Sequence, residues 1–330
     1  MARPAAGCST FECCARHRRS PCNIGSRTVS PSVTLAQLCT WSDEGKQSVR
    51  ATALHATWQQ RNASAGPALQ FGVLHGRSLA RISHAFGGKA PIWGFDSFVG
   101  LPEESPGKLR PAGWAAGALA AVPGASNRGN AATWLPPQTV IQAIINATRR
   151  RIPGEEVQLV AGMYNKSLTA PLARSILRRH GTAAYIDIDC DLYVSTFTAL
   201  DWVFTHGLAR VGTVLGFDDW WNVPCASSDM QRDGAHIATV GGEPEALLQA
   251  ASKHSVWVEC ICGACSAADA ADGRGWRTYF IVRSLAAAHP PEPNFGLAPH
   301  DARAFLRKSN RCRDAWAQAR RGEVVRGTMS

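Results

Sequence analysis

Two apolar stretches of the sequence each end at closely spaced acidic residues. Residues 185–188 lead into Asp189 and Asp191, and residues 214–217 lead into Asp218 and Asp219. Each stretch has the near-continuous apolar body of a buried parallel strand, and ligands in open α/β sheets lie just outside the carboxyl ends of such strands. Four carboxylates gathered there repel one another unless a proton or a cation intervenes. We therefore predict a hard divalent cation held by oxygens. The alternative is that two of these Asp only cap the helices that follow them.

A glycine turn earlier in the chain predicts a second binding feature. Residues 68–78 have the pattern of a strand, a turn at Gly72 and Gly76, and the start of a helix over 77–86. Such a turn lets the backbone approach a ligand, and the helix points its first amides at that ligand. Asp96 ends a second short strand, 91–96, about 20 residues further on, where an acid commonly holds the ribose hydroxyls of a nucleoside cofactor. The alternative for Asp96 is a cap on the next turn.

Alternating strand and helix patterns predict how these residues are positioned. After the glycine turn, strands are expected over 157–162, 183–189 and 209–217, and helices over 138–150, 168–180 and 195–206. This order predicts an α/β fold: a doubly wound, mostly parallel sheet with helices on both faces. A helix that begins at 243 precedes strands over 256–260 and 276–283, and these are expected to form an antiparallel pair at the end of the sheet. The Gly-, Ala- and Pro-rich connection over 99–137 is expected to be a lid, a binding loop or disordered.

The basic charge of the protein lies at its two ends. Of the net charge of +10, residues 1–30 carry +4 and residues 301–330 carry +5, which leaves +1 for the middle. A nearly neutral middle argues against a nucleic-acid groove. No apolar run reaches the roughly 18 residues of a membrane span, so we predict a soluble protein.

Three segments follow from these patterns. Residues 1–34 are predicted to be an unstructured extension or an organelle transit peptide, residues 35–285 the main domain with a lead-in helix over 35–62, and residues 286–330 a basic extension. The compartment is cytoplasmic or, if the first segment is a transit peptide, a plastid or mitochondrion.

The cysteines are predicted to be mostly reduced thiols. There are 11, an odd number, in a chain too long for a small disulfide scaffold. Cys260, Cys262 and Cys265 are candidate zinc ligands, with Cys225 as a fourth. Only one C-x-x-C is present, so reduced loop cysteines are the favoured interpretation.

Several motifs in this order resemble class I S-adenosylmethionine-dependent methyltransferases. The resemblance is strongest to the macrocin O-methyltransferase family, which methylates sugar hydroxyls in macrolide and aminocoumarin antibiotics. It covers about residues 35–285. The motifs are FGVLHGRS at 71–78, GFDSFVGLPE at 94–103, DCDLYVST at 189–196, FDDW at 217–220, GEPEA at 242–246 and FIVR at 280–283.

The resemblance implies an S-adenosyl-L-methionine site and a Mg²⁺ site. Asp189, Asp218 and Asp219 match the metal ligands of the family, and Asp191 matches its proposed general base. The implied cofactor-binding residues are Phe71, Gly72, Gly76, Ser78, Asp96, Ser97, Gly162 and Ser167.

The sequence departs from the family pattern at several positions. Gln70 stands where an acid usually precedes the glycine turn, Cys190 replaces a Gly, Asp187 a His, and Trp220 a Tyr.

The substrate that we expect is a hydroxyl of a sugar or small secondary metabolite. We expect no nucleic acid and no membrane as partner, and a homo-oligomer stays open. Two alternatives are kept: a glycosyltransferase that uses Asp189-Cys190-Asp191 as a D-x-D motif, and a non-catalytic descendant that binds the cofactor.

Overall fold

A computed structural model of the chain describes residues 66–86, 90–106, 108, 110, 112–121, 138–151, 156–220, 242–263 and 277–286. These residues contain one seven-stranded sheet with the strand order β3-β2-β1-β4-β5-β7-β6. The strands are β1 (Ala68–Phe71), β2 (Ile92–Asp96), β3 (Val157–Ala161), β4 (Tyr185–Ile188), β5 (Val214–Phe217), β6 (Trp257–Gly263) and β7 (Thr278–Ser284). The helices are α3 (Arg77–Ala85), α4 (Gln138–Arg151), α5 (Tyr164–Ser167), α6 (Ala170–His180), α7 (Tyr193–Thr205) and α9 (Gly242–Lys253), with a 3₁₀ turn η2 (Ala112–Trp114).

The pairing of the strands confirms the predicted fold class. Strands β1 to β5 pair in parallel, whereas β7 lies antiparallel between β5 and β6. The strand order runs outward in both directions from β1 and β4, as in a doubly wound sheet. This order with an antiparallel β7 is the methyltransferase-type Rossmann-like fold.

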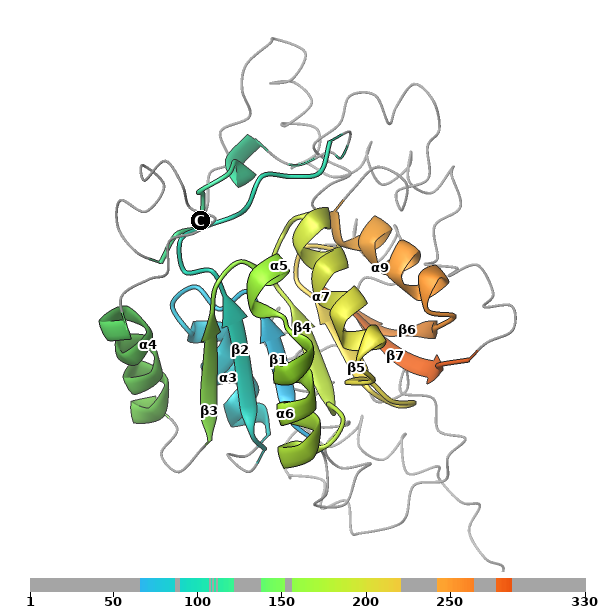
Figure 1. The fold of residues 1–330 in the computed structure, drawn as a ribbon, viewed down its shortest axis with the longest axis horizontal. Coiled ribbons are helices and arrows are strands. Elements are labelled where there is room, and N and C mark those ends of the chain that lie inside the picture. The colour runs from blue at the N-terminus through green and yellow to red at the C-terminus, as the bar shows by residue number, and fades with distance from the viewer. Residues whose placement is uncertain are drawn as a thin grey trace, which may run out of the picture. The chain divides into compact units, whose positions relative to one another are not determined.

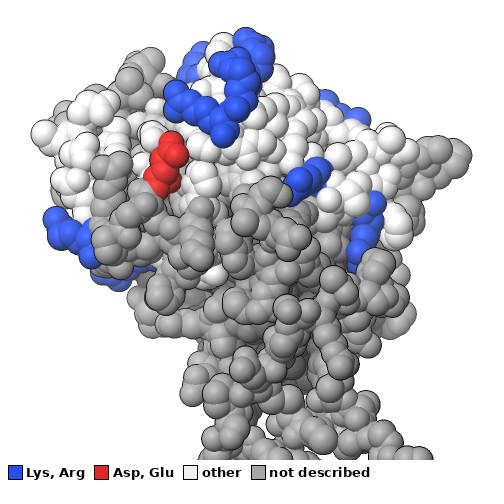
Figure 2. All heavy atoms as spheres, turned by 90° about the horizontal axis from the view of Figure 1, so that it is seen from below, with Lys and Arg blue, Asp and Glu red and all other residues white. Residues whose placement is uncertain are grey.

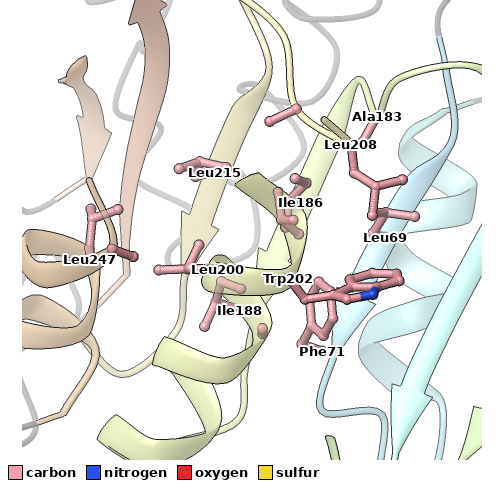
Figure 3. Packing of buried hydrophobic residues seen from close by; sticks show 14 of the residues in the cluster. Leu69, Phe71, Ala183, Ile186, Ile188, Leu200, Trp202, Leu208, Leu215 and Leu247 are labelled. Carbon is pink, nitrogen blue, oxygen red and sulfur yellow. The ribbon is translucent and has the colours of Figure 1, made fainter. Parts of the chain in front are cut away.

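Helices cover both faces of the sheet with two separate apolar layers (Figure 1). On one face, Leu69, Ile186 and Leu215 pack with Leu200 of α7 and Leu247 of α9 (Figure 3). On the other face, residues of α3 and α4 pack against the alternate positions of the same strands. Full burial of a Leu, Ile or Phe side chain contributes roughly 1.5–3 kcal/mol, so the two layers fix the sheet on which the site depends.

The structure corrects two of the predicted boundaries. We expected a strand over 209–217, but β5 begins only at Val214, because a turn at Gly212 (φ +85°) precedes it. We expected a helix over 168–180, and α6 begins two residues later, at Ala170, with Thr169 as its N-cap. The short helix α5, which precedes it, was not predicted. The Thr169 side chain accepts a hydrogen bond from the Leu172 amide, which marks the true start of α6.

The structure describes part of the long connection that was predicted to be a lid, a binding loop or disordered. Residues 99–106, 108, 110 and 112–121 of the connection after β2 lie in the described part of the chain. The predicted segments 1–34 and 287–330, the lead-in helix over 35–62 and the rest of the connection lie outside the described residues.

The face opposite this connection carries no large charged patch among the described residues. Figure 2 shows separate groups of basic side chains on a mainly uncharged surface. Among the helices of the described residues, none has both the length and the apolar character needed to span a bilayer.

Candidate active site

Three neighbouring strands end at the same level and deliver the predicted residues to one place. Phe71, Ile188 and Phe217, the last residues of β1, β4 and β5, are register partners. The next residues along each strand are Gly72, Asp189 and Asp218. The site therefore lies at the carboxyl edge where the strand order reverses, which is the usual ligand position in this architecture.

The glycine turn and the first acid are in direct backbone contact. The Asp189 amide donates to the Phe71 carbonyl at 2.8 Å, and the Gly72 amide donates to the Phe95 carbonyl at 2.9 Å. Gly72 has φ +88°, and a Cβ there would lie 1.7 Å from the Asp189 carbonyl oxygen. Only glycine fits this bend.

The metal ligands implied by the resemblance converge. Asp189, Asp218 and Asp219 each offer a carboxylate oxygen, and these oxygens all lie within 4.8 Å of one another. Asp191 joins the cluster through a side-chain hydrogen bond with Asp219. Such a bond between two carboxyl groups requires one shared proton, which is the expected response to crowded negative charge.

The electrostatics of the cluster show the same crowding. Burial, followed by the charge of Asp189, raises the pKa of Asp191 to about 7. Burial, followed by the charges of Asp191 and Asp218, also raises the pKa of Asp219 well above its usual range. Without a metal ion, the carboxyl groups of Asp191 and Asp219 therefore keep protons at pH values where carboxyl groups are ordinarily ionised.

The residues present fit Mg²⁺. The ion prefers hard oxygen ligands, and three carboxylate oxygens within 4.8 Å of one another would provide such a donor set. Three half-buried carboxylates also offer the negative charge that a divalent cation neutralises. Their chemistry therefore supports the predicted site.

Sequence inspection missed two charged residues of this cluster. Arg277 forms an ion pair with Asp218. The signal was indirect: because β7 runs antiparallel to β5, the residue before Thr278 lies beside the end of β5. Glu243, at the start of α9, is fully buried and accepts a hydrogen bond from the Asp219 amide at 3.1 Å. Its motif, GEPEA, supports the family resemblance and predicts a helix start, but it assigns Glu243 no role in the site.

Glu243 belongs electrostatically to the acidic cluster. Burial, and then the charges of Asp219, Asp218, Asp191 and Asp189, raise its pKa well above the usual range. Its Oε1 atom has no hydrogen-bond partner among the described residues. The site thus contains five carboxyl groups and one described guanidinium.

Asp96 has a different setting at the end of β2. Its Oδ2 accepts from the Val73 and Leu74 amides, both at 2.7 Å, and its Oδ1 accepts from the Phe98 amide at 2.6 Å. Burial raises the pKa of Asp96, and these three hydrogen bonds oppose that rise. The carboxylate thus fixes the glycine turn and caps the next turn, which was the alternative interpretation; contact with a ribose stays a prediction.

Gln70 supports the same turn from inside. It is fully buried, and its amide nitrogen donates to the Gly72 carbonyl at 2.9 Å and to the Ser78 hydroxyl. A carboxylate at this position has no proton to donate when ionised. The unusual residue therefore holds the turn together.

The remaining predicted cofactor residues lie around this turn or close to it. The Gly76 amide donates to the Val73 carbonyl at 2.8 Å, and the Ser97 hydroxyl donates to the Gly100 carbonyl at 2.7 Å. After β3, the Ser167 hydroxyl donates to the Gly162 carbonyl at 3.0 Å.

The Phe71 side chain faces the other way. Its ring stacks on Phe95 at 4.7 Å and meets the Trp202 ring edge-on inside the apolar layer (Figure 3). Of Phe71, only the backbone borders the turn.

A shallow, open depression of about 410 Å³ lies next to the glycine turn. His75 of the turn, Ala121 and one face of α4 line it, and apolar atoms dominate that lining. Sequence patterns do not predict this depression, because it depends on how α4 packs beside the turn.

The cysteine prediction fails at one position. We expected reduced thiols in the run that contains Cys260, but Cys260 is disulfide-bonded. Pairing depends on distances in the folded chain, which spacing does not fix. Cys190 is a free, buried thiol, as predicted. The side chains of Cys262 and Cys265 lie outside the described residues.

Comparison with known proteins gives structural similarity only. No protein-family model and no curated protein matches the sequence. The chain is similar to the calicheamicin methyltransferase CalS11, with 18% identity, a TM-score of 0.45, and coverage of 75% of this chain and 89% of that one. It is also similar to an O-methyltransferase from Bacillus cereus in complex with SAH, with 11% identity, a TM-score of 0.38, and coverage of 76% and 86%. Values this low carry no conclusion about substrate, cofactor or metal.

Proposed function

We propose that this protein is a Mg²⁺-dependent O-methyltransferase that moves a methyl group from S-adenosyl-L-methionine to a hydroxyl of a sugar or small secondary metabolite. One observation carries the proposal. The Gly72 turn, which only glycine can form, lies against the Asp189 backbone, and the Asp189 carboxylate belongs to a cluster of three that suits a divalent cation.

The turn and its surroundings suit a nucleoside donor. Gly72 and Gly76 bring the backbone close to a ligand, and α3 starts at Arg77 with its first amides directed towards the turn. The apolar depression beside His75 would accept a flat base. These features support S-adenosyl-L-methionine as the donor.

The acidic cluster supplies what methylation of a hydroxyl needs. A neutral hydroxyl is a poor nucleophile, so proton removal at the acceptor oxygen lowers the barrier. Asp189, Asp218 and Asp219 would hold Mg²⁺, which when bound polarises the acceptor oxygen. Asp191 would take the proton as the oxygen attacks the methyl carbon and the sulfur leaves in line. Holding oxygen and methyl carbon in contact contributes the rest of the rate enhancement.

The two alternatives have less support. A glycosyltransferase interpretation gives the D-x-D motif a role but leaves the Gly72 turn and the Asp218-Asp219 pair without one. A non-catalytic descendant was suggested by Gln70, yet Gln70 maintains the turn through two hydrogen bonds.

The direct test is incubation of the full chain with a methyl-labelled donor, Mg²⁺ and a panel of hydroxylated sugars and small metabolites, followed by mass spectrometry. We expect one labelled product, and none when the metal is chelated. Stabilisation by a nucleotide diphosphate with manganese, but not by S-adenosylhomocysteine, would instead favour the glycosyltransferase.

A further inference from the structure

The first part of the connection after β2 packs against the turn that carries the acids. Leu101 exchanges hydrogen bonds of 2.8 Å with the backbone of Gly117 and Ala118, which closes this part into a compact loop. Leu101 and Trp114 of the loop form a small apolar cluster with Leu192, the residue directly after Asp191. The loop therefore touches the DCDL segment itself.

A buried acid of the loop makes the polar part of this contact. Glu104 is 8% exposed. Its Oε2 accepts from the Tyr193 amide at 2.9 Å, and its Oε1 accepts from the Val194 amide at 3.0 Å and from the Ser105 amide at 2.7 Å. Tyr193 and Val194 are the first residues of α7, whose own N-cap, Leu192, provides no side-chain hydrogen bond.

Glu104 thus replaces the missing cap from 89 positions away. A carboxylate at a helix N-terminus satisfies amides that otherwise have no partner and lies favourably in the helix dipole. Because α7 begins two residues after Asp191, this cap also fixes the end of the turn that carries Asp189 and Asp191.

The same loop reaches the second half of the acidic cluster. Lys108 forms an ion pair with Glu245 of α9, and its Nζ lies 4.5 Å from the centre of the Tyr193 ring. The Tyr193 hydroxyl donates to Gln249 of α9 at 2.5 Å. The first turn of α9 also holds Glu243, which accepts from the Asp219 amide. The loop, α7 and α9 are therefore linked where the acids converge.

The turn between β4 and α7 needs such support. Asp191 has φ +65°, a left-handed conformation that costs a non-glycine residue energy and persists only when its surroundings enforce it. Glu104 on one side and β4 on the other provide that enforcement.

We infer that Glu104 is a positioning residue for the Asp189–Asp191 turn, acting through α7. This inference rests on the proposed function, because it gives the turn its role in metal binding and proton removal.

The test compares Glu104→Ala with Glu103→Ala, because Glu103 is the exposed neighbour of the same type. Magnesium affinity is measured by calorimetry on the full chain, and exchange of the Tyr193 and Val194 amides by hydrogen–deuterium methods. We expect Glu104→Ala to expose both amides, to weaken magnesium binding roughly 10- to 100-fold, and to lower kcat by up to about 100-fold with little change in KM for the methyl donor. Glu103→Ala should stay within about two-fold of the wild type.

Glu104→Gln keeps one acceptor oxygen and should give intermediate values; it carries the test if the alanine variant does not fold. Faster amide exchange without any change in magnesium affinity or kcat would overturn the inference, because Glu104 would then be a helix cap only. If the wild type binds magnesium but transfers no methyl group, the proposed function fails, while the affinity difference between the two alanine variants still tests Glu104.

Discussion

Acids at the carboxyl ends of different strands have opposite environments in this molecule. Asp96, at the end of β2, accepts three backbone N–H groups at 2.6–2.7 Å. Asp191 and Asp219, after β4 and β5, face other carboxyl groups and share a proton. Aspartates at strand ends thus have two roles. One holds a turn, and the others form a cluster whose negative charge favours a bound cation.

This difference separates a structural role from a chemical one. A carboxylate that accepts several amide hydrogen bonds has its charge compensated by the protein. Carboxylates that repel one another destabilise the metal-free fold, and such stored cost is typical of functional sites. The acids of β4 and β5 should therefore respond to metal, whereas Asp96 should not.

The largest expected effect is the loss of activity on Asp189→Ala. Removing one metal ligand should reduce turnover by roughly 10³-fold or more, since the metal provides several kcal/mol of transition-state stabilisation. Binding of S-adenosylhomocysteine should persist. The control is Asp201→Ala, because Asp201 pairs only with Lys253 and His254 among the described residues. Equal activity in the two variants would show that Asp189 has no special role in catalysis.

Gly72→Ala should damage both regions at once. The new Cβ would overlap the Asp189 carbonyl, and alanine disfavours φ +88°, so we expect a loss of more than about 3 kcal/mol of unfolding free energy. Gly113→Ala is the matched control, because nothing lies within 4 Å of a Cβ there. Urea unfolding measures both; a near-neutral Gly72→Ala would show that the turn is not packed against β4 as described.

Asp96→Ala and Asp219→Asn should change stability in opposite directions. The first leaves three amides without their acceptor and should cost roughly 2 kcal/mol. The second replaces a carboxyl group whose pKa is raised by its neighbours with an amide, which donates to Asp191 without taking up a proton, so the metal-free protein should gain about 1 kcal/mol. Thermal unfolding in the presence of a chelator measures both changes. Destabilisation by Asp219→Asn in metal-free protein would remove the distinction drawn between the two environments.

A smaller effect should appear in the pH dependence of stability. The pKa of Asp191 is about 7 in the folded state against an ordinary value of 3.8, so the folded state binds more protons between these values. Metal-free stability should therefore fall as pH rises from about 4 to 7. Saturating Mg²⁺ should flatten that decline, because the cation replaces the proton. Melting temperatures at pH 5 and pH 7.5, with and without Mg²⁺, measure this. A melting temperature of the metal-free protein that rises with pH would contradict the prediction.

The sequence predicted the sheet and the convergence of its acids because both follow from local patterns. Apolar runs that end in Asp mark buried strands, and strand–helix alternation places their ends on one edge. Arg277 and Glu243 were missed because their places depend on how the last strand pairs and how α9 packs. The same limit explains Glu104, whose partners lie 89 and 90 positions away. Asp96 was expected to face a ligand, yet its hydrogen bonds to backbone amides could not be seen in spacing.

Calorimetric titration of S-adenosylhomocysteine into the full chain, with and without Mg²⁺, tests the central claim most directly. The account predicts binding in both conditions, together with separate magnesium binding that disappears in Asp189→Ala. Absence of S-adenosylhomocysteine binding in both conditions, or magnesium binding that Asp189→Ala leaves intact, would contradict it.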